Sequence, residues 1–215
     1  MNLFNAVPMN KLMFTFLLAV FFSLRLLNAQ ELKDSKFSFI GYGGIGFGTV
    51  ENENTLNYNL NSNSGAILFN YKIVKRVGIS SGIGLNKLSG NGSNYLGDFN
   101  HIRTVVKIPL LVSFDSNIAE KIKIMFFVGP YIQHIAEDEF RYLNVRQQDV
   151  FEGWNIGGKF NLSFLYEFID KVSVGLNYTC QSDITKFQTV QTKFFFDEQR
   201  LNNLNNIGVI FQIEL

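Results

Sequence analysis

Residues 153–168 read GWNIGGKFNLSFLYEF, and this stretch shows the property that decides the fold. Its large apolar side chains fall on alternate residues, and the residues between them are mostly small or polar. Alternation of this kind indicates a β-strand with one apolar and one polar face. The apolar set is Trp154, Ile156, Phe160, Leu162, Phe164, Tyr166 and Phe168, and the polar set includes Asn155, Lys159, Asn161 and Glu167.

The same period of two runs from Lys36 to the end of the 215-residue chain. It predicts eight strands, near residues 37–50, 64–75, 77–88, 100–114, 121–134, 153–168, 172–182 and 203–215. Long polar loops are expected at 51–63, 89–99, 135–152 and 183–202, and short turns at 75–76, 115–120 and 169–171. This asymmetry is typical of outer-membrane barrels. We therefore expect an all-β fold, an eight-stranded antiparallel up-and-down transmembrane β-barrel with both termini periplasmic.

Charge tests this prediction, because a basic side chain facing lipid at mid-membrane costs about 2–4 kcal/mol. On the apolar register of the eight strands the only charged residues are Lys75 and Lys87, both at strand ends. The apolar register is therefore expected to face hydrocarbon and the other to face the lumen, where the charges must pair or hold water. The expected lumen network is Lys72, Arg103, Lys107, Lys123, Lys159, Glu167 and Glu214, together with asparagines.

Glycines in FIGYGGIGFGTV, residues 39–50, have the G-x-G-x-x-G spacing of a dinucleotide-binding loop. The stretch that follows, ENENTLNYNLNSNS, has no helical period, so the nucleotide interpretation fails. Phe39, Ile45 and Phe47 share the outward register, whereas Gly44, Gly46 and Gly48 share the inward one. An eight-stranded barrel has just enough room for its own side chains. We interpret the inward glycines as spacers for larger residues opposite them.

A lipocalin is the alternative exported eight-stranded barrel, with an apolar interior and a surface that faces water. It would require the Lys/Asn/Gly register to form the surface. Strands so rich in glycine would be weak there, which favours the membrane barrel.

Residues 1–29 have the features of a cleavable signal peptide: Lys11, the apolar run LMFTFLLAVFFSL, and Ala29 at the cleavage site. The domain prediction is thus a signal peptide at 1–29 and an outer-membrane barrel domain at 30–215. Either Met1 or Met9 fits as the start. Cys180 is the only cysteine, so no internal disulfide can form, and we interpret it as a small semi-apolar residue near a strand end.

Two segments resemble the PorT-like outer-membrane β-barrel family. VVKIPLLVSF (105–114) is similar to the family's EIPLLLKY strand, and FFVGPYIQHI (126–135) is similar to the AGPYLGYL strand that follows it. VSVGLNYTCQSDI (172–184) and NNIGVIFQIEL (205–215) are similar to its last two strands. The matching motif residues are Ile108, Pro109, Leu110, Leu111, Gly129, Pro130 and Tyr131.

The resemblance covers essentially the whole mature chain and implies an eight-stranded outer-membrane barrel. Leu215 departs from the aromatic residue that often ends such barrels, and CQSDI replaces a glycine-containing stretch. The family's namesake takes part in a protein-secretion and gliding-linked pathway, whereas many relatives have no assigned role. Pro109 and Pro130 cannot donate to the strand ladder, so a bulge or a locally open pairing is expected at each.

No catalytic, metal or cofactor site is expected, and a net charge of +1 gives no reason to expect nucleic-acid binding. His101 and His134 are interpreted as water-exposed rim residues, because no further metal ligands occur at workable spacing. EDEF (137–140) and FFFDEQR (194–200) are interpreted as solvated loop tips or a partner site. Ser93, Asp98 and His101 could in principle form a rim lipid-modifying site, but these residue types are expected in such a loop anyway.

The leading functional hypothesis is a small barrel with a side-chain-filled lumen and a structural or interaction role through its external loops. It would serve as an accessory of a secretion or envelope complex. Its expected partners are outer-membrane lipid, the barrel-insertion machinery and envelope or secretion proteins. The alternatives are a narrow porin-like channel for small solutes and the rim enzyme.

Overall fold

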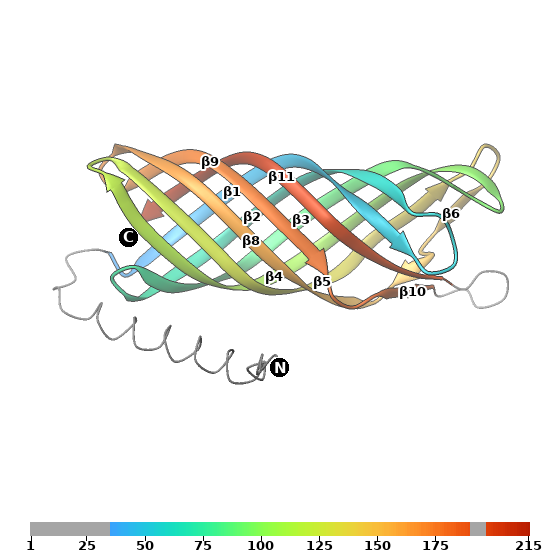
Figure 1. The fold of residues 1–215 in the computed structure, drawn as a ribbon, viewed down its shortest axis with the longest axis horizontal. Helices are drawn as coiled ribbons and strands as arrows, with labels where there is room; N and C mark the ends of the chain where they lie inside the picture. Colours follow the sequence, from blue (N-terminus) through green and yellow to red (C-terminus); the bar gives the residue numbers. More distant parts are fainter. Residues whose placement is uncertain (1–34, 190–196) are drawn as a thin grey trace, which may run out of the picture.

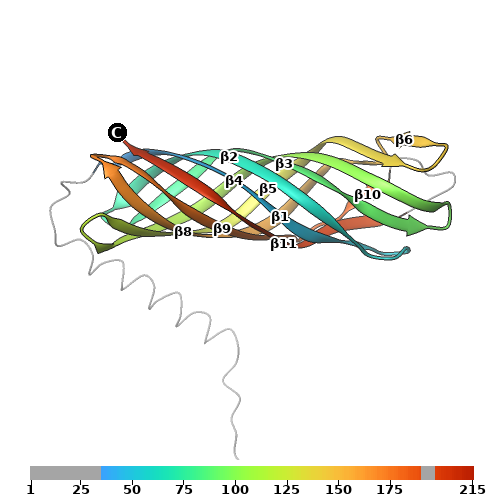
Figure 2. The same cartoon turned by 90° about the horizontal axis from the view of Figure 1, so that it is seen from above.

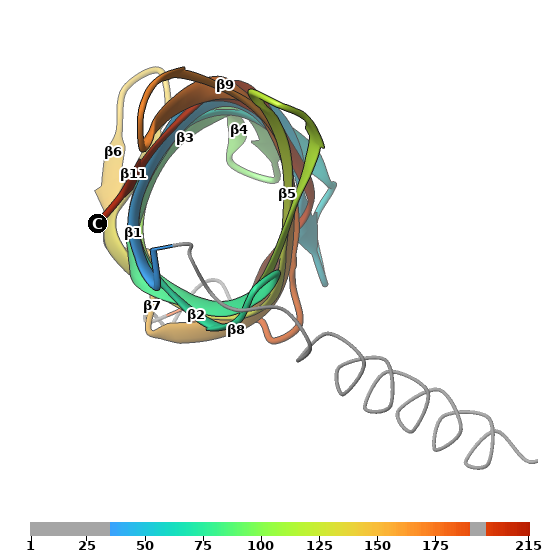
Figure 3. The ribbon, with the colours of Figure 1, turned by 90° about the vertical axis from the view of Figure 1, so that its left-hand side faces the viewer.

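The computed structural model describes residues 35–189 and 197–215, and within them it contains a closed antiparallel ring of eight long strands (Figure 3). Neighbours in the ring pair in chain order, and β1 also pairs with β11, which closes the cylinder. The predicted eight-stranded antiparallel up-and-down barrel is confirmed. The ring consists of β1 (Phe37–Asn52), β2 (Tyr58–Val74), β3 (Val77–Asn94), β4 (Gly97–Ala119), β5 (Ile122–Arg141), β8 (Trp154–Ile169), β9 (Val172–Asp183) and β11 (Glu198–Glu214).

The two ends of the barrel differ in their connections. The tight turns at 75–76, 120–121 and 170–171 gather at one end, together with Phe37 and Glu214, and we call this the turn end. The opposite end, the loop end, carries the other connections and three short strands (Figure 1 and Figure 2). These are β6 (Arg146–Gln148), β7 (Phe151–Glu152) and β10 (Phe187–Thr189). The expected signal peptide, residues 1–29, lies outside the described residues.

Several strands extend much further toward the loop end than the sequence predicts. β4 has 23 residues and β5 has 20, whereas a tilted strand needs about 9–11 to cross a membrane. The prediction of long loops at 51–63 and 89–99 is wrong, because strands continue through most of both segments and leave only short connections. The prediction failed because asparagine, serine and glycine have low strand propensity, which paired backbone overrides here.

The outer surface has an apolar band, which we call the belt. The predicted outward side chains lie on it, and many remain more than 40% exposed to the space around the barrel. The belt includes Phe39, Ile45, Phe47, Ile67, Phe69, Ile83, Leu85, Ile108, Leu110, Val112, Val128, Ile132, Trp154, Ile156, Phe164, Leu176, Tyr178, Ile207, Val209 and Phe211.

Beyond the belt, toward the loop end, the outward residues become polar. We call this part of the barrel the extension, and it comprises residues 49–63, 87–104, 136–153, 181–189 and 197–203. Its outward side chains include Thr49, Asn59, Asn61, Lys87, Thr104 and Glu137. Nothing helical in the described part of the chain is long and apolar enough to cross a membrane.

The glycines act as spacers in only some of the predicted positions. A Cβ on Gly157 would meet the ring of Tyr131 at 2.2 Å, so this glycine does make room for a large inward side chain. On Gly44 and Gly208, by contrast, a Cβ would meet backbone atoms of the paired strand, at 2.5 Å and 1.9 Å. At the contact of β1 with β11 the glycines therefore allow close approach of two backbones, which corrects the spacer interpretation there.

Candidate functional site

The barrel interior is the candidate site. The inward side chains of β4 show its layers in order from the turn end to the loop end. Polar and apolar side chains alternate in blocks along this one strand. In order they are Asp115, Ser113, Leu111, Pro109, Lys107, Val105, Arg103, His101 and Phe99, all buried. The lumen is filled by stacked layers, and the predicted charges belong to separate layers instead of one network.

At the turn end, ion pairs fill the lumen. Lys72 Nζ lies 3.1 Å from a carboxylate oxygen of Asp115, and Lys123 pairs with Glu214. Lys72 is on β2 and Asp115 is on β4, whereas Lys123 is on β5 and Glu214 is on β11, so each pair links two strands that are not neighbours in the ring. Glu167 lies apart from these pairs, because its carboxylate accepts a hydrogen bond from the backbone of Lys171 in the tight turn.

Next to these pairs lies an apolar cluster that the sequence analysis did not predict. Its members are buried side chains on the inward register of the belt strands. The absence of charge on the outward register does not indicate how many inward residues are apolar, so the sequence pattern does not predict this cluster. The cluster, which we call the turn-side core, contains Ile40, Tyr42, Leu68, Leu111, Met125, Phe127, Leu165 and Ile210.

A layer with two lysines follows, which we call the lysine layer. Lys107 Nζ donates to Gln181 Oε1 at 2.9 Å and lies 4.6 Å from the centre of the Tyr131 ring. Lys159 Nζ donates to the Tyr42 hydroxyl at 2.5 Å and lies over that ring. Both lysines border one small space of about 10 Å³.

Asp183 is the carboxylate nearest this layer, and neutral donors hold it. One of its oxygens accepts from the Tyr131 hydroxyl at 2.6 Å and from Gln133 Nε2 at 2.8 Å. The other accepts from the backbone N–H of Leu201 at 2.9 Å. Asp183 therefore joins β5, β9 and β11 inside the barrel.

In the extension the lumen holds a buried charged cluster. Arg103 Nε donates to an oxygen of Asp138 at 2.7 Å, and His101 Nε2 lies 2.8 Å from the same oxygen. The other imidazole nitrogen, Nδ1, lies 2.8 Å from the Tyr58 hydroxyl. A neutral imidazole satisfies both contacts, because it donates from Nε2 to the carboxylate and accepts at Nδ1 from the tyrosine. Arg103 also donates to Gln199 at 2.8 Å.

The surroundings of this cluster favour that protonation state. Burial lowers the pKa of His101 to about 4, and the charge of Arg103 lowers it further, against the opposing effect of Asp138. For Asp138, burial acts to raise the pKa, but the charge of Arg103 and the hydrogen bond from His101 outweigh it, so the pKa lies below its ordinary value. The cluster is thus an arginine–carboxylate pair with a neutral histidine.

Apolar side chains from six of the eight ring strands, and from β7 and β10, surround this cluster and form what we call the loop-end core. His101 stacks on the Phe140 ring with 4.1 Å between centroids, and Arg103 lies over the rings of Phe151 and Phe187. Its members are Val50, Tyr58, Leu60, Leu88, Phe99, Val105, Ile135, Phe140, Val150, Phe151, Phe187, Leu201 and Leu204.

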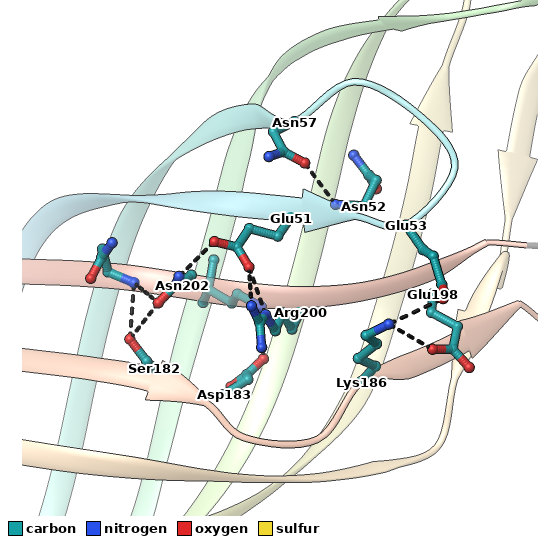
Figure 4. A network of polar contacts seen from close by, with 12 residues as sticks. Glu51, Asn52, Glu53, Asn57, Ser182, Asp183, Lys186, Glu198, Arg200 and Asn202 are labelled. Carbon is teal, nitrogen blue, oxygen red and sulfur yellow. Dashed lines mark hydrogen bonds and ion pairs between the residues drawn. The ribbon is translucent and has the colours of Figure 1, made fainter.

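The outer face of the extension carries a polar collar across β1, β9 and β11 (Figure 4). Glu51 accepts from Arg200 Nε and Asn202 Nδ2, both at 2.6 Å. Lys186 contacts carboxylate oxygens of Glu53 and Glu198 at 3.1 and 3.0 Å.

The buried carboxylate of Asp197 joins the last loop to the first hairpin. It accepts hydrogen bonds from the backbone N–H groups of Glu53 and Asn54 and from the Thr55 hydroxyl. The loop end is therefore cross-linked by polar contacts between segments that are about 140 residues apart.

The tips of the loop end surround an open cleft of about 1100 Å³. Leu56, Leu96, Leu143 and Val145 border it, and each exposes more than half of its surface. Arg141 and Asp98 are the charged residues in its lining, and the remaining lining residues are asparagines, aromatic residues, glycines and Ser93.

The family-motif residues lie where β4 meets β5. Ile108 and Leu110 point outward into the belt, whereas Leu111 and Tyr131 are buried inside. Backbone pairing is interrupted at both prolines: the register between β3 and β4 skips Pro109, and that between β4 and β5 skips Pro130. A Cβ on Gly129 would meet the carbonyl of Leu110 at 2.2 Å, so the open pairing also brings two backbones close.

Three sequence interpretations are corrected by the interior. His101 is wrongly assigned to a water-exposed rim, because it is fully buried, whereas His134 is half-buried against Trp154. EDEF is not a solvated tip, since it belongs to the last part of β5 and Asp138 is buried in the lumen. The described part of FFFDEQR likewise contains the buried Asp197. Residues 194–196 of that motif lie outside the described residues.

The residues of the rim-enzyme alternative are not assembled into a site. Ser93 and Asp98 face each other across the β3–β4 hairpin, while both ring nitrogens of His101 are engaged by Tyr58 and Asp138. Within residues 35–189 and 197–215 no three His, Cys, Asp or Glu residues gather as a metal site would require. Cys180 points outward beside Phe160, half-buried near the loop-side edge of the belt.

Comparison with known proteins gives the fold. No family model and no curated protein matches the chain. Among solved structures, Neisserial surface protein A is similar with a TM-score of 0.52 and 9% identity, over 84% of this chain and 98% of that one. OprG from Pseudomonas aeruginosa is similar with a TM-score of 0.52 and 10% identity, over 85% and 98%. The chain thus shares the eight-stranded fold of these outer-membrane barrels.

Proposed function

We propose that this chain is an integral outer-membrane β-barrel with a filled lumen, which holds an ordered platform on the outer side of the membrane and acts through that platform's contacts. The observation that carries the proposal is the belt. A continuous ring of exposed Ile, Phe, Leu and Val side chains would aggregate in water, and it fits the hydrocarbon layer that outer-membrane barrels occupy. The fold shared with outer-membrane proteins supports the same location.

The filled lumen argues for an interaction role over a solute channel. Between the turn end and the loop end a solute would meet the Lys72–Asp115 pair, the turn-side core, the lysine layer and the loop-end core in succession. Eight strands leave little space beyond their own side chains. A narrow channel is therefore the second candidate, and it requires several of these layers to open together.

The extension supplies the surface for contacts. Its polar collar and its loop-end core keep the tips in a defined arrangement, so little conformational entropy is lost when a partner binds. Exposed apolar side chains on an otherwise polar surface mark interaction sites. Leu143 is 95% exposed and Leu56 is 71% exposed beside the cleft. We therefore assign the partner contact to these tips.

Location and orientation can be tested together. Membrane fractionation followed by heat-modifiable gel mobility is expected to place a folded barrel in the outer membrane. For orientation, Leu143→Cys and Lys121→Cys are compared in a Cys180→Ser background. A membrane-impermeant maleimide on intact cells should label position 143 and not position 121, because the turn end and both termini are then periplasmic. Labelling at 121 alone would reverse the orientation.

The interaction role needs a second experiment. A photo-crosslinking amino acid at position 143 or 56 should give a discrete adduct in cells, and the same probe at position 121 serves as the matched control. If neither tip position gives an adduct and the refolded protein shows conductance steps in a planar bilayer, the channel becomes the better description.

The accessory role in secretion is a finer proposal that rests on the PorT-like motifs of β4 and β5. Deletion of the chain should then impair secretion or envelope integrity. Restoration by the wild type but not by a variant with Leu56, Leu143 and Val145 changed to Ser would connect that role to the tips. A deletion strain with normal secretion and a normal envelope would exclude it.

A further inference from the structure

The lysine layer holds more positive than negative charge. Lys107 and Lys159 come from β4 and β8 and border the same space, and the charge of Lys159 acts on Lys107. Asp183 also acts on Lys107, but the hydrogen bonds of its carboxylate come from Tyr131, Gln133 and the Leu201 backbone. Each lysine donates instead to a neutral oxygen. The ion pairs of the described residues include neither of them.

Several hydrogen-bond donors that border the same space lack an acceptor. An ammonium group carries three N–H donors, and each lysine has one hydrogen-bond acceptor in the structure. Asn86 also borders the space, is 4% exposed, and its side-chain amide nitrogen has no partner. Burying a donor without an acceptor is unfavourable, because the group loses its hydrogen bonds to water and gains none. The arrangement therefore calls for a species that accepts from several donors at once.

Size and charge restrict that species. The free space of about 10 Å³ has room for about one water-sized particle. A water molecule would accept two hydrogen bonds but also needs acceptors for its own two protons. A monatomic anion accepts from every donor around it and offsets the surplus positive charge. A phosphate or a carboxylate-bearing solute would exceed the space.

We propose that the lysine layer binds one small monovalent anion of the halide class, between the ammonium groups of Lys107 and Lys159 and the amide of Asn86. The anion would join β3, β4 and β8 inside the barrel, and it binds the closed cylinder but not the unfolded chain. Binding of this kind raises the stability of the folded state as the free anion concentration rises. The inference concerns the lumen and does not depend on the role proposed for the loop-end tips.

The test uses the full chain, refolded in detergent micelles, at constant ionic strength with chloride replaced by isethionate. The unfolding midpoint is followed by heat-modifiable mobility. In chloride the wild type should unfold about 2–6 °C higher than in isethionate. Lys107→Met and Lys159→Met should lose this difference. Lys87→Met is the matched control, because Lys87 is exposed on the outer surface, and it should keep the difference.

Crystals of the wild type grown in bromide decide the case even if the lumen variants do not fold. An anomalous bromide peak within hydrogen-bond distance of both ammonium groups supports the proposal. Without a peak, the layer holds water and the proposal fails. It fails equally if Lys107→Met and Lys159→Met fold and keep the full chloride effect, because the halide then acts elsewhere.

Discussion

Seven of the eight ring strands, all except β8, run through both the belt and the extension, yet the faces of the two parts are inverted. In the belt the outward side chains are Ile, Phe, Leu and Val, and the lumen contains the lysine layer and the turn-side core. In the extension the outward side chains are Asn, Thr, Glu and Arg, and the lumen contains the loop-end core. The surroundings of each part therefore determine which register is apolar. Hydrocarbon requires an apolar exterior, whereas water requires an apolar interior.

In two strands, β11 and β5, the boundary between the two parts coincides with a bulge. In β11 the register shifts opposite Phe47 and Thr49, where Asn203 has φ of 50°. Below this bulge even-numbered residues such as Leu204 and Ile210 point inward, and above it odd-numbered residues such as Leu201 do. In β5 the register shifts between the partners of Thr104 and Val105, where Ala136 is skipped. Each bulge re-aims the strand as it leaves the belt.

The largest effect is expected inside the extension. Phe151→Ala removes a fully buried ring from the loop-end core, and such changes cost about 3–5 kcal/mol of unfolding free energy. Leu143→Ala, at the 95% exposed tip, is the control and should stay within about 0.5 kcal/mol. Urea unfolding of the refolded barrel measures both. Equally small effects of the two substitutions would mean that the extension has no core that unfolds cooperatively, and that its interior does not differ from its exposed tips in this respect.

The next largest effect is expected when a charge is placed on the outward face of the belt and compared with the same charge on the outward face of the extension. Leu176→Arg puts a charge on the outward face of the belt and should cost about 2–4 kcal/mol in a bilayer. Asn61→Arg makes a similar charge on the outward face of the extension and should change stability by less than about 0.5 kcal/mol. The difference in unfolding free energy between the two arginine variants, measured in phospholipid vesicles, indicates where the hydrocarbon layer ends along the barrel. Equal costs would place residue 61 in lipid and move the boundary toward the loop end.

The belt was predictable from the sequence because one register of the strands is free of charge except at strand ends, as the lipid-facing side of a membrane barrel must be. The extension was not, although its alternation is present: Tyr58 and Leu60 alternate with Asn59 and Asn61. That segment has its apolar residues on the inward register, the opposite of the belt, and so it looked like a polar loop. The extension could have been predicted from one feature of the sequence. The alternation continues without a break, while the apolar residues move from one register to the other.

The interior partners were the least predictable part. Lys107 and Arg103 were expected to point inward, but their acceptors, Gln181 and Asp138, come from other strands. Asp138 lies in a segment that reads as a charged loop, and the sequence does not give the register that brings it to Arg103. Pairing across a closed barrel depends on the stagger of the strands, which one sequence does not specify.

A smaller effect is expected from pH, which should change the stability of the folded barrel through the charged cluster in the extension. Burial lowers the pKa of His101 to about 4, from an ordinary value of 6.5, so between these two values the unfolded chain binds more protons than the folded one. Stability should therefore fall as the pH decreases through this window, by about 1–2 kcal/mol between pH 7 and pH 5. The lowered pKa of Asp138 acts in the same direction at lower pH.

His101→Gln provides the matched variant, because its amide can donate to Asp138 and accept from Tyr58 without titrating. Its unfolding free energy should lose most of the decrease between pH 7 and pH 5 that the wild type shows. His134→Gln, at the edge of the belt, should keep the wild-type dependence. A wild-type profile unaltered by His101→Gln would show that the buried cluster does not set the acid limit of the extension.

The smallest effect is expected on the outer face of the extension, where water competes for every contact. Arg200 is 42% exposed and Glu51 is 30% exposed, and pairs of this kind are worth less than about 1 kcal/mol. Arg200→Ala should therefore lower the unfolding free energy by less than that, and raising the salt concentration from 0.1 to 1 M should remove most of the difference between the variant and the wild type. Phe151→Ala removes apolar packing and no charge, so its cost should be the same at both salt concentrations. A salt-insensitive loss of several kcal/mol from Arg200→Ala would mean that the collar, and not the core beneath it, keeps the extension in place.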